Sequence, residues 1–223
     1  MQHSVIENAA DLGVAFDGDA DRSLFADENG ELVDGDTTLW IIARALRSQG
    51  DLENSQVVAT IMSNIGLELA FKAENIKLVR TNVGDKYVLD ELMQSGSAIG
   101  GEQSGHIIFP KLSLVGDGIV TALLLLKAIG DKSLSEATDG FIRFPQTLKK
   151  ATVKEKLPLE LIPSIMEMRE QIEREIESSG QGRLNLRYSG TENVARVMIE
   201  GENQAVIDEQ ALRLVSVIET NLG

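Results

Sequence analysis

Three aspartates stand at alternate positions directly after an apolar run, in the stretch "VAFDGDADRS" of residues 14–23. They are Asp17, Asp19 and Asp21, and Arg22 follows them. Carboxylates this close together repel one another, so a cation is expected to gather them. Oxygen ligands of this kind suit Mg²⁺, which keeps its other positions for water or a phosphate oxygen. The spacing therefore predicts a magnesium site.

The same stretch has three other interpretations. A solvated acidic face needs no metal, and residues 1–36 carry ten acidic residues and one basic residue. An EF-hand loop would place Glu28 at its twelfth position, but Arg22 stands where that loop needs glycine, and the flanks are typical of strands. A phosphatase of the haloacid dehalogenase type, with Asp17 as nucleophile, would have D-x-D-x-T, whereas Asp21 occupies the last position.

A glycine-rich stretch, "GGEQSGH" at residues 100–106, carries a second set of polar side chains. Alternate side chains of an extended loop face the same way, so Glu102, Ser104 and His106 could meet a single ligand. The first two suit sugar hydroxyls, and a neutral His106 suits proton transfer near pH 7. A simple hairpin turn with incidental polar residues is the alternative.

A third stretch, "RYSGTENVAR" at residues 187–196, lies between two predicted strands. It offers charges, hydroxyls and an accessible backbone, which together favour a bound phosphate. An ordinary β-turn is the alternative. The candidate phosphate-binding residues are Arg187, Ser189, Gly190, Thr191 and Arg196.

Strands alternate with helices over the first 140 residues, which indicates an α/β unit with a parallel or mixed sheet. We expect a buried strand over 12–16 and a hairpin that turns at Asn29-Gly30. A helix should follow, with Asp36 as its N-cap and Gly50 past its end. Further strands are expected over 56–62 and 76–81 and in two short pieces within 97–109, and further helices over 66–75, 84–96, 117–130 and 133–140.

The pattern changes near residues 140–146, after which it is typical of an α+β domain of about 80 residues. A strand over 147–153 and a long helix over 161–180 come first. Two strands over 182–190 and 194–201 and a final helix from Asn203 follow. A second domain is therefore predicted to begin near Phe144.

Composition narrows the class of protein. The formal net charge of −14 argues against nucleic acid or an anionic membrane surface as a partner. The longest apolar run is far shorter than the roughly 20 residues of a membrane span, and no secretory signal is visible. The chain has no cysteine, which excludes disulfides and thiolate metal sites. These features predict a cytoplasmic protein.

Taken together, three stretches resemble, in order and spacing, the metal, sugar and phosphate loops of the α-D-phosphohexomutases. They are "DLGVAFDGDADR", "GGEQSGH" and "RYSGTENVARVMIEG". The stretches "TIMSNIGLE", "TNVGDKYV" and "GDGIV", with Gln103, are similar to the phosphoglucosamine mutase branch. The resemblance implies a mixed-sheet α/β domain III at 37–143 and an α+β, TATA-binding-protein-like domain IV at 144–223. Residues 1–36 would be the tail of a truncated α/β domain II.

The resemblance also implies a reaction. A phosphoserine donates its phosphoryl group to a hexose phosphate, and the bisphosphate formed returns its other phosphate to the serine. In the phosphoglucosamine branch, glucosamine 6-phosphate and glucosamine 1-phosphate are interconverted. Carried over by position, Mg²⁺ would be held by Asp17, Asp19 and Asp21, with Arg22 beside it. Substrate would be held by Glu102, Ser104, Arg187, Ser189, Gly190, Thr191 and Arg196. The acid/base or phosphate-contact candidates are His106 and Lys86.

The nucleophilic serine of the family lies in a first domain, far upstream of the metal loop, and no serine of this chain has that setting. We therefore expect a C-terminal half that is inactive alone, with a phosphosugar and the missing N-terminal half as partners. The apolar Val14 and Phe16 are expected to be exposed. Smaller departures are Ala20 where glycine is usual and Asn193 where proline is usual. A phosphomannomutase or phosphoglucomutase fragment, a non-catalytic phosphosugar-binding module and a magnesium phosphatase remain open.

Overall fold

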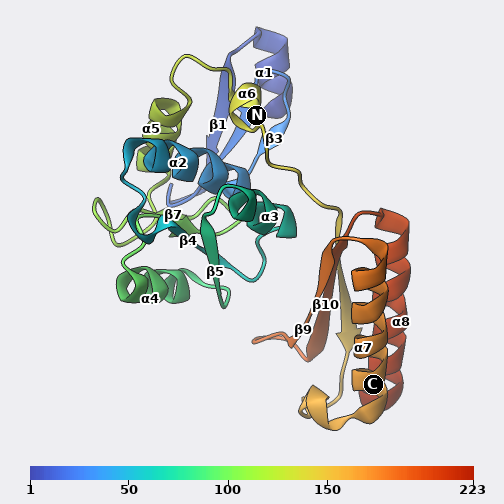
Figure 1. The fold of residues 1–223 in the computed structure, drawn as a ribbon. Coiled ribbons are helices and arrows are strands. Elements are labelled where there is room, and N and C mark those ends of the chain that lie inside the picture. The colour runs from blue at the N-terminus through green and yellow to red at the C-terminus, as the bar shows by residue number, and fades with distance from the viewer. The chain divides into compact units, whose positions relative to one another are not determined.

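The computed structural model describes all of residues 1–223 (Figure 1). Contacts divide the chain into two compact units, Met1–Ile142 and Arg143–Gly223, and each unit has its own sheets and core. The predicted three-part division into 1–36, 37–143 and 144–223 stays a prediction. None of the helices is both long and apolar enough to cross a membrane.

A three-stranded antiparallel sheet carries the aspartate loop, which we define as residues 17–22. Helix α1 (Gln2–Asn8) precedes β1 (Leu12–Phe16), β2 (Ser23–Asp27) and β3 (Leu32–Val33), and the strand order is β1-β2-β3. The aspartate loop connects β1 to β2. Strands β2 and β3 form the predicted hairpin, which turns through Gly30 with a left-handed φ of 78°.

Strand β1 lies at the edge of this sheet, and the prediction that it is buried is wrong. Val14 is 40% exposed and Phe16 is 42% exposed. The physical reason is that strand side chains are buried only where another element packs over their face of the sheet, and at residues 14–16 side chains on both faces remain exposed. The expectation that these two apolar side chains lie at the surface is confirmed.

The second sheet of Met1–Ile142 is mixed, as predicted. Its order is β5-β4-β6-β7, in which β4 pairs in parallel with β5 and β6, and β6 pairs antiparallel with β7. The strands are β4 (Gln56–Thr60), β5 (Lys77–Thr81), β6 (Gly100–Gly101) and β7 (Ile107–Ile108). The helices are α2 (Gly35–Gln49), α3 (Ile65–Ala73), α4 (Asp85–Ser95), α5 (Gly118–Ile129) and α6 (Leu134–Ala137), and a short 3-10 turn, η1 (Glu53–Ser55), precedes β4.

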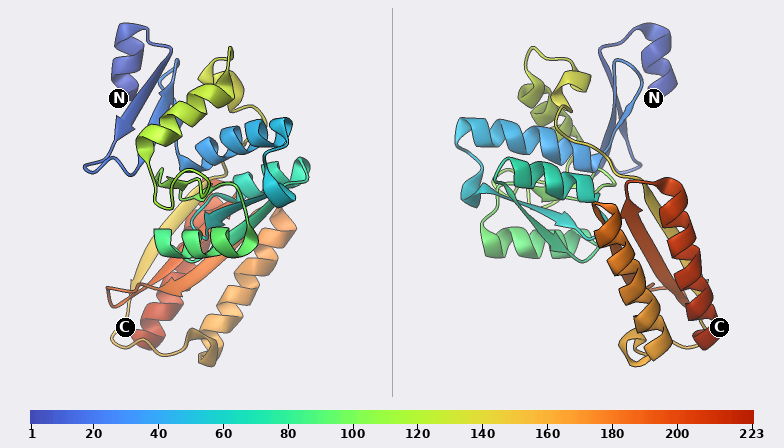
Figure 2. Two further views of the ribbon diagram at one scale, coloured as in Figure 1. Left: turned by 90° about the vertical axis from the view of Figure 1, so that its left-hand side faces the viewer. Right: turned by 45° about the vertical axis from the view of Figure 1, so that its right-hand side comes forward.

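Helices cover both faces of β4, which explains why this strand is apolar along most of its length and buried throughout. Val57 and Ala59 belong to the main core, which also contains Trp40 of α2 and Phe71 of α3. The two aromatic rings are 5.5 Å apart. Val58 points to the other face, where α4 packs. Figure 2 shows α2 and α3 on one side of the sheet and α4 on the other.

Helix α2 begins earlier than predicted. Asp34, not Asp36, is its N-cap, and the Asp34 carboxylate accepts a hydrogen bond from the Thr37 N–H at 3.2 Å. Asp36 lies inside the first turn, fully buried, and accepts a hydrogen bond from the Asn64 N–H at 2.8 Å. Asp36 is therefore a tertiary contact between α2 and the start of α3. The helix ends at Gly50 as predicted.

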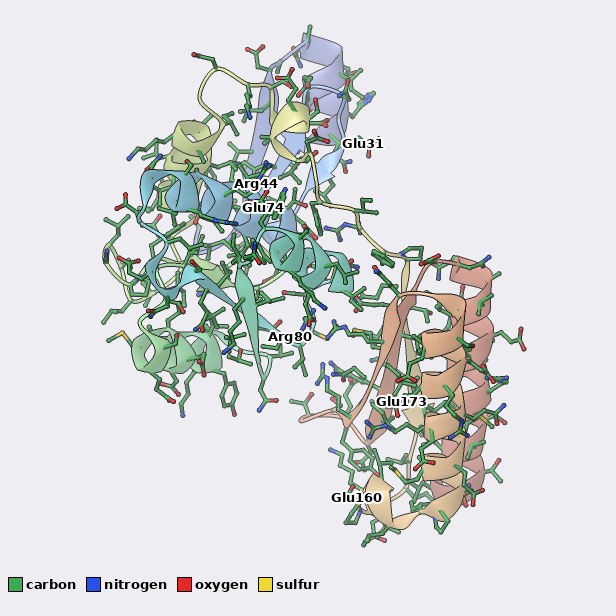
Figure 3. The ribbon with its side chains drawn as sticks, in the orientation of Figure 1. Glu31, Arg44, Glu74, Arg80, Glu160 and Glu173 are labelled. Atoms are coloured by element: carbon green, nitrogen blue, oxygen red, sulfur yellow. The ribbon has the colours of Figure 1, made fainter.

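A surface ion pair ties the middle of α2 to the end of α3 (Figure 3). The Arg44 Nε lies 3.0 Å from the Glu74 Oε1, and the same guanidinium stacks 4.8 Å from the centre of the Trp40 ring. The contact with the indole adds a cation–π interaction to the ion pair.

The unit Arg143–Gly223 is the predicted α+β arrangement. Its antiparallel sheet has the order β8-β10-β9, and α7 and α8 cover one face of it (Figure 1). The elements are β8 (Gln146–Thr152), the 3-10 turn η2 (Leu159–Leu161), α7 (Pro163–Ser179), β9 (Gly182–Tyr188), β10 (Val194–Gly201) and α8 (Gln204–Leu222). Buried isoleucines of both helices, such as Ile172 and Ile218, pack against Val197 and Ile199 of β10.

Candidate functional site

The three aspartates of the aspartate loop lie together. Asp17, Asp19 and Asp21 each offer a carboxylate oxygen, and these oxygens lie within 4.8 Å of one another. Arg22 folds back over the loop, because its backbone N–H donates a hydrogen bond to the Asp17 Oδ1 at 3.2 Å. The Arg22 Nε lies 3.8 Å from the Asp17 Oδ2 and 3.7 Å from the Asp21 Oδ1.

This donor set fits a divalent cation. Three carboxylates face one guanidinium, so negative charge is left over at the loop. The Asp21 Oδ1 is buried and has no hydrogen-bond partner, which is costly unless another group compensates it. Hard oxygen ligands from separate carboxylates are those that Mg²⁺ takes.

The aspartate loop turns at Ala20, which has a left-handed φ of 58°. A non-glycine residue costs about 1–2 kcal/mol in this region. A main-chain contact holds the turn: the Gly118 N–H donates a hydrogen bond to the Ala20 carbonyl oxygen at 2.9 Å. The departure from glycine at this position is thus accommodated with some strain.

The sugar loop, which we define as residues 102–106, packs main chain to main chain against its neighbours. The Ser23 N–H donates a hydrogen bond to the Gly105 carbonyl oxygen at 3.2 Å, and the Gly35 N–H donates one to the Gln103 carbonyl oxygen at 3.0 Å. Gly105 has a φ of 92°, and a side chain there would overlap the Ser23 carbonyl oxygen. The aspartate loop and the sugar loop are therefore close neighbours.

Glu102 and Ser104 lie together, whereas His106, which the sequence places with them, is directed toward Asp21 and Gly116. The Glu102 Oε1 accepts a hydrogen bond from the Gly84 N–H at 2.9 Å, and the Oε2 accepts one from the Ser104 hydroxyl at 3.3 Å. Glu102 remains partly exposed and Ser104 is exposed. Lys86 is exposed on the first turn of α4, two residues beyond Gly84. Glu102 and Ser104 can thus offer a carboxylate and a hydroxyl to one ligand.

His106 is buried, with 6% of its surface exposed. Its Nδ1 lies 3.0 Å from the Asp21 Oδ2, and its Nε2 accepts a hydrogen bond from the Gly116 N–H at 3.2 Å. Both ring nitrogens are thus engaged by protein groups. A catalytic role for His106 stays a prediction.

In the other unit, the phosphate loop, defined as residues 189–193, connects β9 to β10. Ser189 is buried, and its N–H donates a hydrogen bond to the Val194 carbonyl oxygen at 2.9 Å. Gly190 and Thr191 are exposed, and no atom lies near the position that a side chain at 190 would take. The loop is therefore open enough for an anion to approach its backbone.

Two arginines stand opposite each other beside this loop. Arg187 of β9 pairs with Arg196 of β10, a placement of like charges that attracts negatively charged groups. Burial, together with the charge of Arg196, lowers the pKa of the Arg187 guanidinium. The Arg196 Nη2 donates hydrogen bonds to the Ser189 Oγ at 3.2 Å and to Glu192 at 3.0 Å.

The sequence did not indicate a role for some residues that contact these loops. Gly84 and Gly116 donate backbone hydrogen bonds to Glu102 and His106. Their stretches resembled the family, but no role could be assigned because a backbone contact leaves no trace in residue type. Lys150 binds Glu192 at 3.1 Å, and the Lys156 Nζ donates a hydrogen bond to the Ser189 carbonyl oxygen at 2.8 Å. These lysines lie far from the loop in the sequence.

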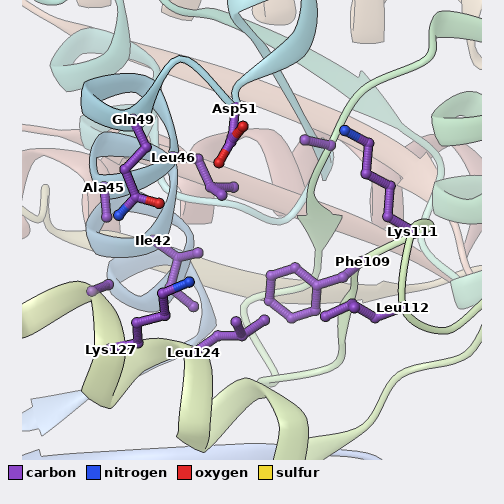
Figure 4. A pocket seen from close by; sticks show the side chains of 12 residues that line it. Ile42, Ala45, Leu46, Gln49, Asp51, Phe109, Lys111, Leu112, Leu124 and Lys127 are labelled. Atoms are coloured by element: carbon purple, nitrogen blue, oxygen red, sulfur yellow. The ribbon is translucent and has the colours of Figure 1, made fainter.

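A separate cavity of about 340 Å³ lies in Met1–Ile142 between α2, α5 and the segment after β7 (Figure 4). Its lining is mostly apolar and includes Ile42, Leu46, Phe109 and Leu124. None of the predicted site residues lines it. The polar groups of the candidate site therefore lie outside this cavity, and the site is identified by those groups.

Two family models match the chain. Residues 34–144 match the model for "Phosphoglucomutase/phosphomannomutase, alpha/beta/alpha domain III". Residues 148–217 match "Phosphoglucomutase/phosphomannomutase, C-terminal domain". The aspartate loop lies outside both matches. The chain belongs to the phosphoglucomutase/phosphomannomutase family, the α-D-phosphohexomutases, as the sequence predicted.

Curated relatives cover the whole chain. A phosphoglucosamine mutase of Acetivibrio thermocellus is 48% identical over 229 residues, which are 100% of this chain and 50% of the relative. A phosphoglucosamine mutase of Koribacter versatilis is 44% identical over 216 residues, 96% of this chain and 46% of the relative. The chain therefore spans about half the length of these relatives.

Solved structures share the fold. An N-acetylglucosamine-phosphate mutase in its product complex has a TM-score of 0.73 at 22% identity, over 93% of this chain and 48% of the other. An Aspergillus fumigatus N-acetylphosphoglucosamine mutase, in complex with GlcNAc-6P and magnesium, has a TM-score of 0.73 at 23% identity, over 94% and 49%.

Proposed function

We propose that this chain is the metal-, sugar- and phosphate-binding part of a phosphoglucosamine mutase, which interconverts glucosamine 6-phosphate and glucosamine 1-phosphate. The observation that carries the proposal is the packing of the sugar loop on the aspartate loop, through Gly105 and Ser23. It sets hydroxyl-binding groups next to a cluster of metal-type carboxylates. The names of the curated relatives support the choice of glucosamine as the sugar.

In this proposal each group has a role that follows from its chemistry. Asp17, Asp19 and Asp21 hold Mg²⁺, and bound Mg²⁺ supplies positive charge that offsets the charge of the transferring phosphoryl group. Arg22 keeps the loop closed and adds a second positive charge. Magnesium in complex with a structural neighbour supports this choice of metal.

The sugar is held by Glu102 and Ser104. Their carboxylate and hydroxyl groups accept and donate hydrogen bonds to ring hydroxyls in either orientation of the substrate. Lys86 is the candidate for moving a proton to or from the sugar oxygen that gains or loses the phosphoryl group.

The phosphate group that does not react is held in the C-terminal unit. Arg187 and Arg196 supply charge-assisted hydrogen bonds. Ser189, Gly190 and Thr191 supply hydroxyl and backbone donors. An anion there also relieves the repulsion between the two arginines.

We infer that the phosphoryl donor, a phosphoserine, belongs to the half of the curated relatives that these 223 residues do not match. We infer that the chain is inactive by itself and works in the cytoplasm, in the company of an N-terminal half.

A mutase assay tests this function. The chain is mixed with Mg²⁺, glucosamine 6-phosphate and a hexose bisphosphate, with and without the N-terminal half of the Acetivibrio thermocellus relative. We expect turnover only when both halves are present, and loss of that turnover in Asp19→Ala. Binding of glucosamine 6-phosphate without any turnover in the mixture would instead favour a non-catalytic binding module.

Two controls separate the remaining alternatives. Phosphate release by the chain alone that is lost in Asp17→Asn would indicate a magnesium phosphatase. Faster turnover of mannose 6-phosphate or glucose 6-phosphate than of glucosamine 6-phosphate would move the assignment to another branch of the family.

A further inference from the structure

His106 differs from the other histidine of the chain. His3 is exposed on α1 and lies beside Glu7, whereas His106 is buried between the sugar loop, the aspartate loop and the segment that leads into α5. A buried histidine must satisfy both ring nitrogens, and the groups that do so determine which nitrogen carries the proton.

The partners of His106 assign its tautomer. A backbone amide can only donate, so the Gly116 N–H requires an unprotonated Nε2 as its acceptor. A neutral imidazole then carries its proton on Nδ1, and the Asp21 Oδ2, 3.0 Å away, accepts it. The imidazole therefore accepts a hydrogen bond from the Gly116 amide at Nε2 and donates one to the Asp21 carboxylate from Nδ1.

The ring lies in close contact with a glycine that leaves room for it. Gly116 lies flat against it, and a Cβ at residue 116 would fall 2.6 Å from both ring nitrogens. The next glycine, Gly118, approaches the aspartate loop as closely, because a Cβ there would lie 2.7 Å from the Arg22 carbonyl oxygen. The segment with these two glycines thus clamps the imidazole and the loop together.

The hydrogen bond from the His106 Nδ1 fixes the orientation of the Asp21 carboxylate and so the direction of its two oxygens. The Oδ2 is occupied by His106, whereas the Oδ1 is buried without a hydrogen-bond partner and lies 3.7 Å from the Arg22 Nε. Rotation of the carboxylate would break the hydrogen bond to His106. One oxygen is therefore kept as an acceptor for a cation.

We propose that His106 is a positioning residue, whose Nδ1–H, set by the Gly116 amide, orients Asp21 for a divalent cation. The inference rests on the metal site of the proposed function. It gives His106 a role other than proton transfer to substrate, for which neither ring nitrogen is available while both contacts are made. Groups that orient metal ligands in this way typically change metal affinity by 10–100-fold when they are removed.

Two substitutions separate the hydrogen bond from the bulk of the side chain. The amide nitrogen of asparagine reaches about as far as Nδ1, so His106→Asn can keep the donor to Asp21. The amide of glutamine reaches about as far as Nε2, so His106→Gln can keep the contact with Gly116 and lose the donor. Binding of Mn²⁺ to the full chain is measured by electron paramagnetic resonance, with His3→Gln and Asp19→Ala as controls.

We expect about tenfold or greater loss of Mn²⁺ affinity in His106→Gln and no more than about threefold loss in His106→Asn. His3→Gln should bind as wild type, and Asp19→Ala should lose binding. An unchanged affinity in His106→Gln, or equal losses in both His106 variants, would overturn the positioning role while leaving the metal site intact. Absence of Mn²⁺ binding in the wild type, or binding that Asp19→Ala does not affect, would overturn the metal site and this inference together.

A measurement on the unsubstituted chain keeps the proposal testable if a variant does not fold. Long-range ¹H–¹⁵N spectra of the ¹⁵N-labelled protein distinguish the two neutral tautomers of histidine. We expect the proton of His106 on Nδ1, with His3 as the internal reference. A proton on Nε2 of His106 would overturn the assignment.

Discussion

Between β1 and α5, main-chain hydrogen bonds join separate loops to one another, whereas charged side chains join the loop between β9 and β10 to its surroundings. In the first region, backbone amides of Ser23, Gly35 and Gly118 donate to carbonyl oxygens of neighbouring loops. In the second, Glu192 accepts hydrogen bonds from both Lys150 and Arg196.

The two regions therefore differ in how much they can adapt. Main-chain contacts at closely approached glycines allow little movement, so we expect the aspartate loop and the sugar loop to keep this arrangement when a ligand binds. Exposed ion pairs are weak and easily exchanged, so an anion can replace Glu192 as the partner of Arg196. A rigid region suits a metal, and an adaptable one suits a phosphate group that must be released again.

The largest expected effect is a loss of stability in the rigid region, which contains Gly105, when compared with the same substitution at Gly190 in the adaptable region. Gly105→Ala should destabilise Met1–Ile142 by about 3 kcal/mol or more, because the new Cβ meets a backbone oxygen at a strained φ. Gly190→Ala should change stability by less than about 0.5 kcal/mol, because its surroundings are open. Urea unfolding measures the difference, with tryptophan fluorescence for Gly105→Ala and circular dichroism for Gly190→Ala.

The single tryptophan allows the unfolding of one unit to be followed separately. Trp40 belongs to the core of Met1–Ile142, so its fluorescence reports on that unit alone. Circular dichroism reports on both units. Equal midpoints for the two glycine variants would contradict the contrast between the regions.

The next largest effect concerns anion binding. Arg187→Ala should weaken binding of glucosamine 6-phosphate about tenfold or more, because a charge-assisted hydrogen bond contributes about 1.5–3 kcal/mol. Arg174→Ala is the matched control, since it removes an exposed guanidinium from α7 of the same unit. Calorimetric titration measures both, and similar losses would show that only the overall charge of the unit matters.

A smaller effect, an increase in phosphate affinity, is expected if Glu192 competes with an anion at the phosphate loop. Hydrogen bonds from Lys150 first, and then from Arg196, lower the pKa of Glu192, so its carboxylate is ionised at neutral pH. Glu192→Gln should strengthen binding of inorganic phosphate about two- to fivefold, because exposed ion pairs of this kind are weak and exchange easily for another anion. Weaker binding in the same titration would mean that Glu192 organises the site and does not compete with the anion.

The smallest effect is a dependence of stability on pH. Hydrogen bonds from Ser135 lower the pKa of Glu28, at the β2–β3 turn, to about 2 from its ordinary 4.5. Because the folded-state pKa is lowered, this contribution is fully present above pH 4.5 and is lost as the pH falls toward 2. Glu28→Gln should thus cost about 0.5–1 kcal/mol at pH 7 and progressively less between pH 4.5 and 2.

Glu31→Gln removes an exposed carboxylate from the same turn and is the matched control. Urea midpoints of Met1–Ile142 at pH 7, 4 and 3 test the effect of Glu28. A loss in Glu28→Gln that grows as the pH falls would contradict the assignment.

Elements with strong periodic patterns were predictable, and boundaries set by distant contacts were not. The amphipathic helix that ends at Gly50 was found because the glycine cap is a local signal. Its start at Asp34 was missed because Asp36 looks like a cap, but its side chain binds the Asn64 backbone 28 residues away. The exposure of β1 likewise depends on which elements pack over its two faces, and an apolar run carries no such information.

For the candidate site, residue types and order along the chain were enough to identify the carboxylates, the sugar loop, the arginines and the family. These features are local, because motif chemistry depends on a few neighbouring side chains. Only the tertiary structure decided that Gly116 and Asp21 hold His106 from opposite sides, that Gly84 binds Glu102, and that Glu192 lies between Lys150 and Arg196. The physical reason is that these contacts use backbone amides or partners far apart in sequence, whose meeting is set by the packing of whole elements.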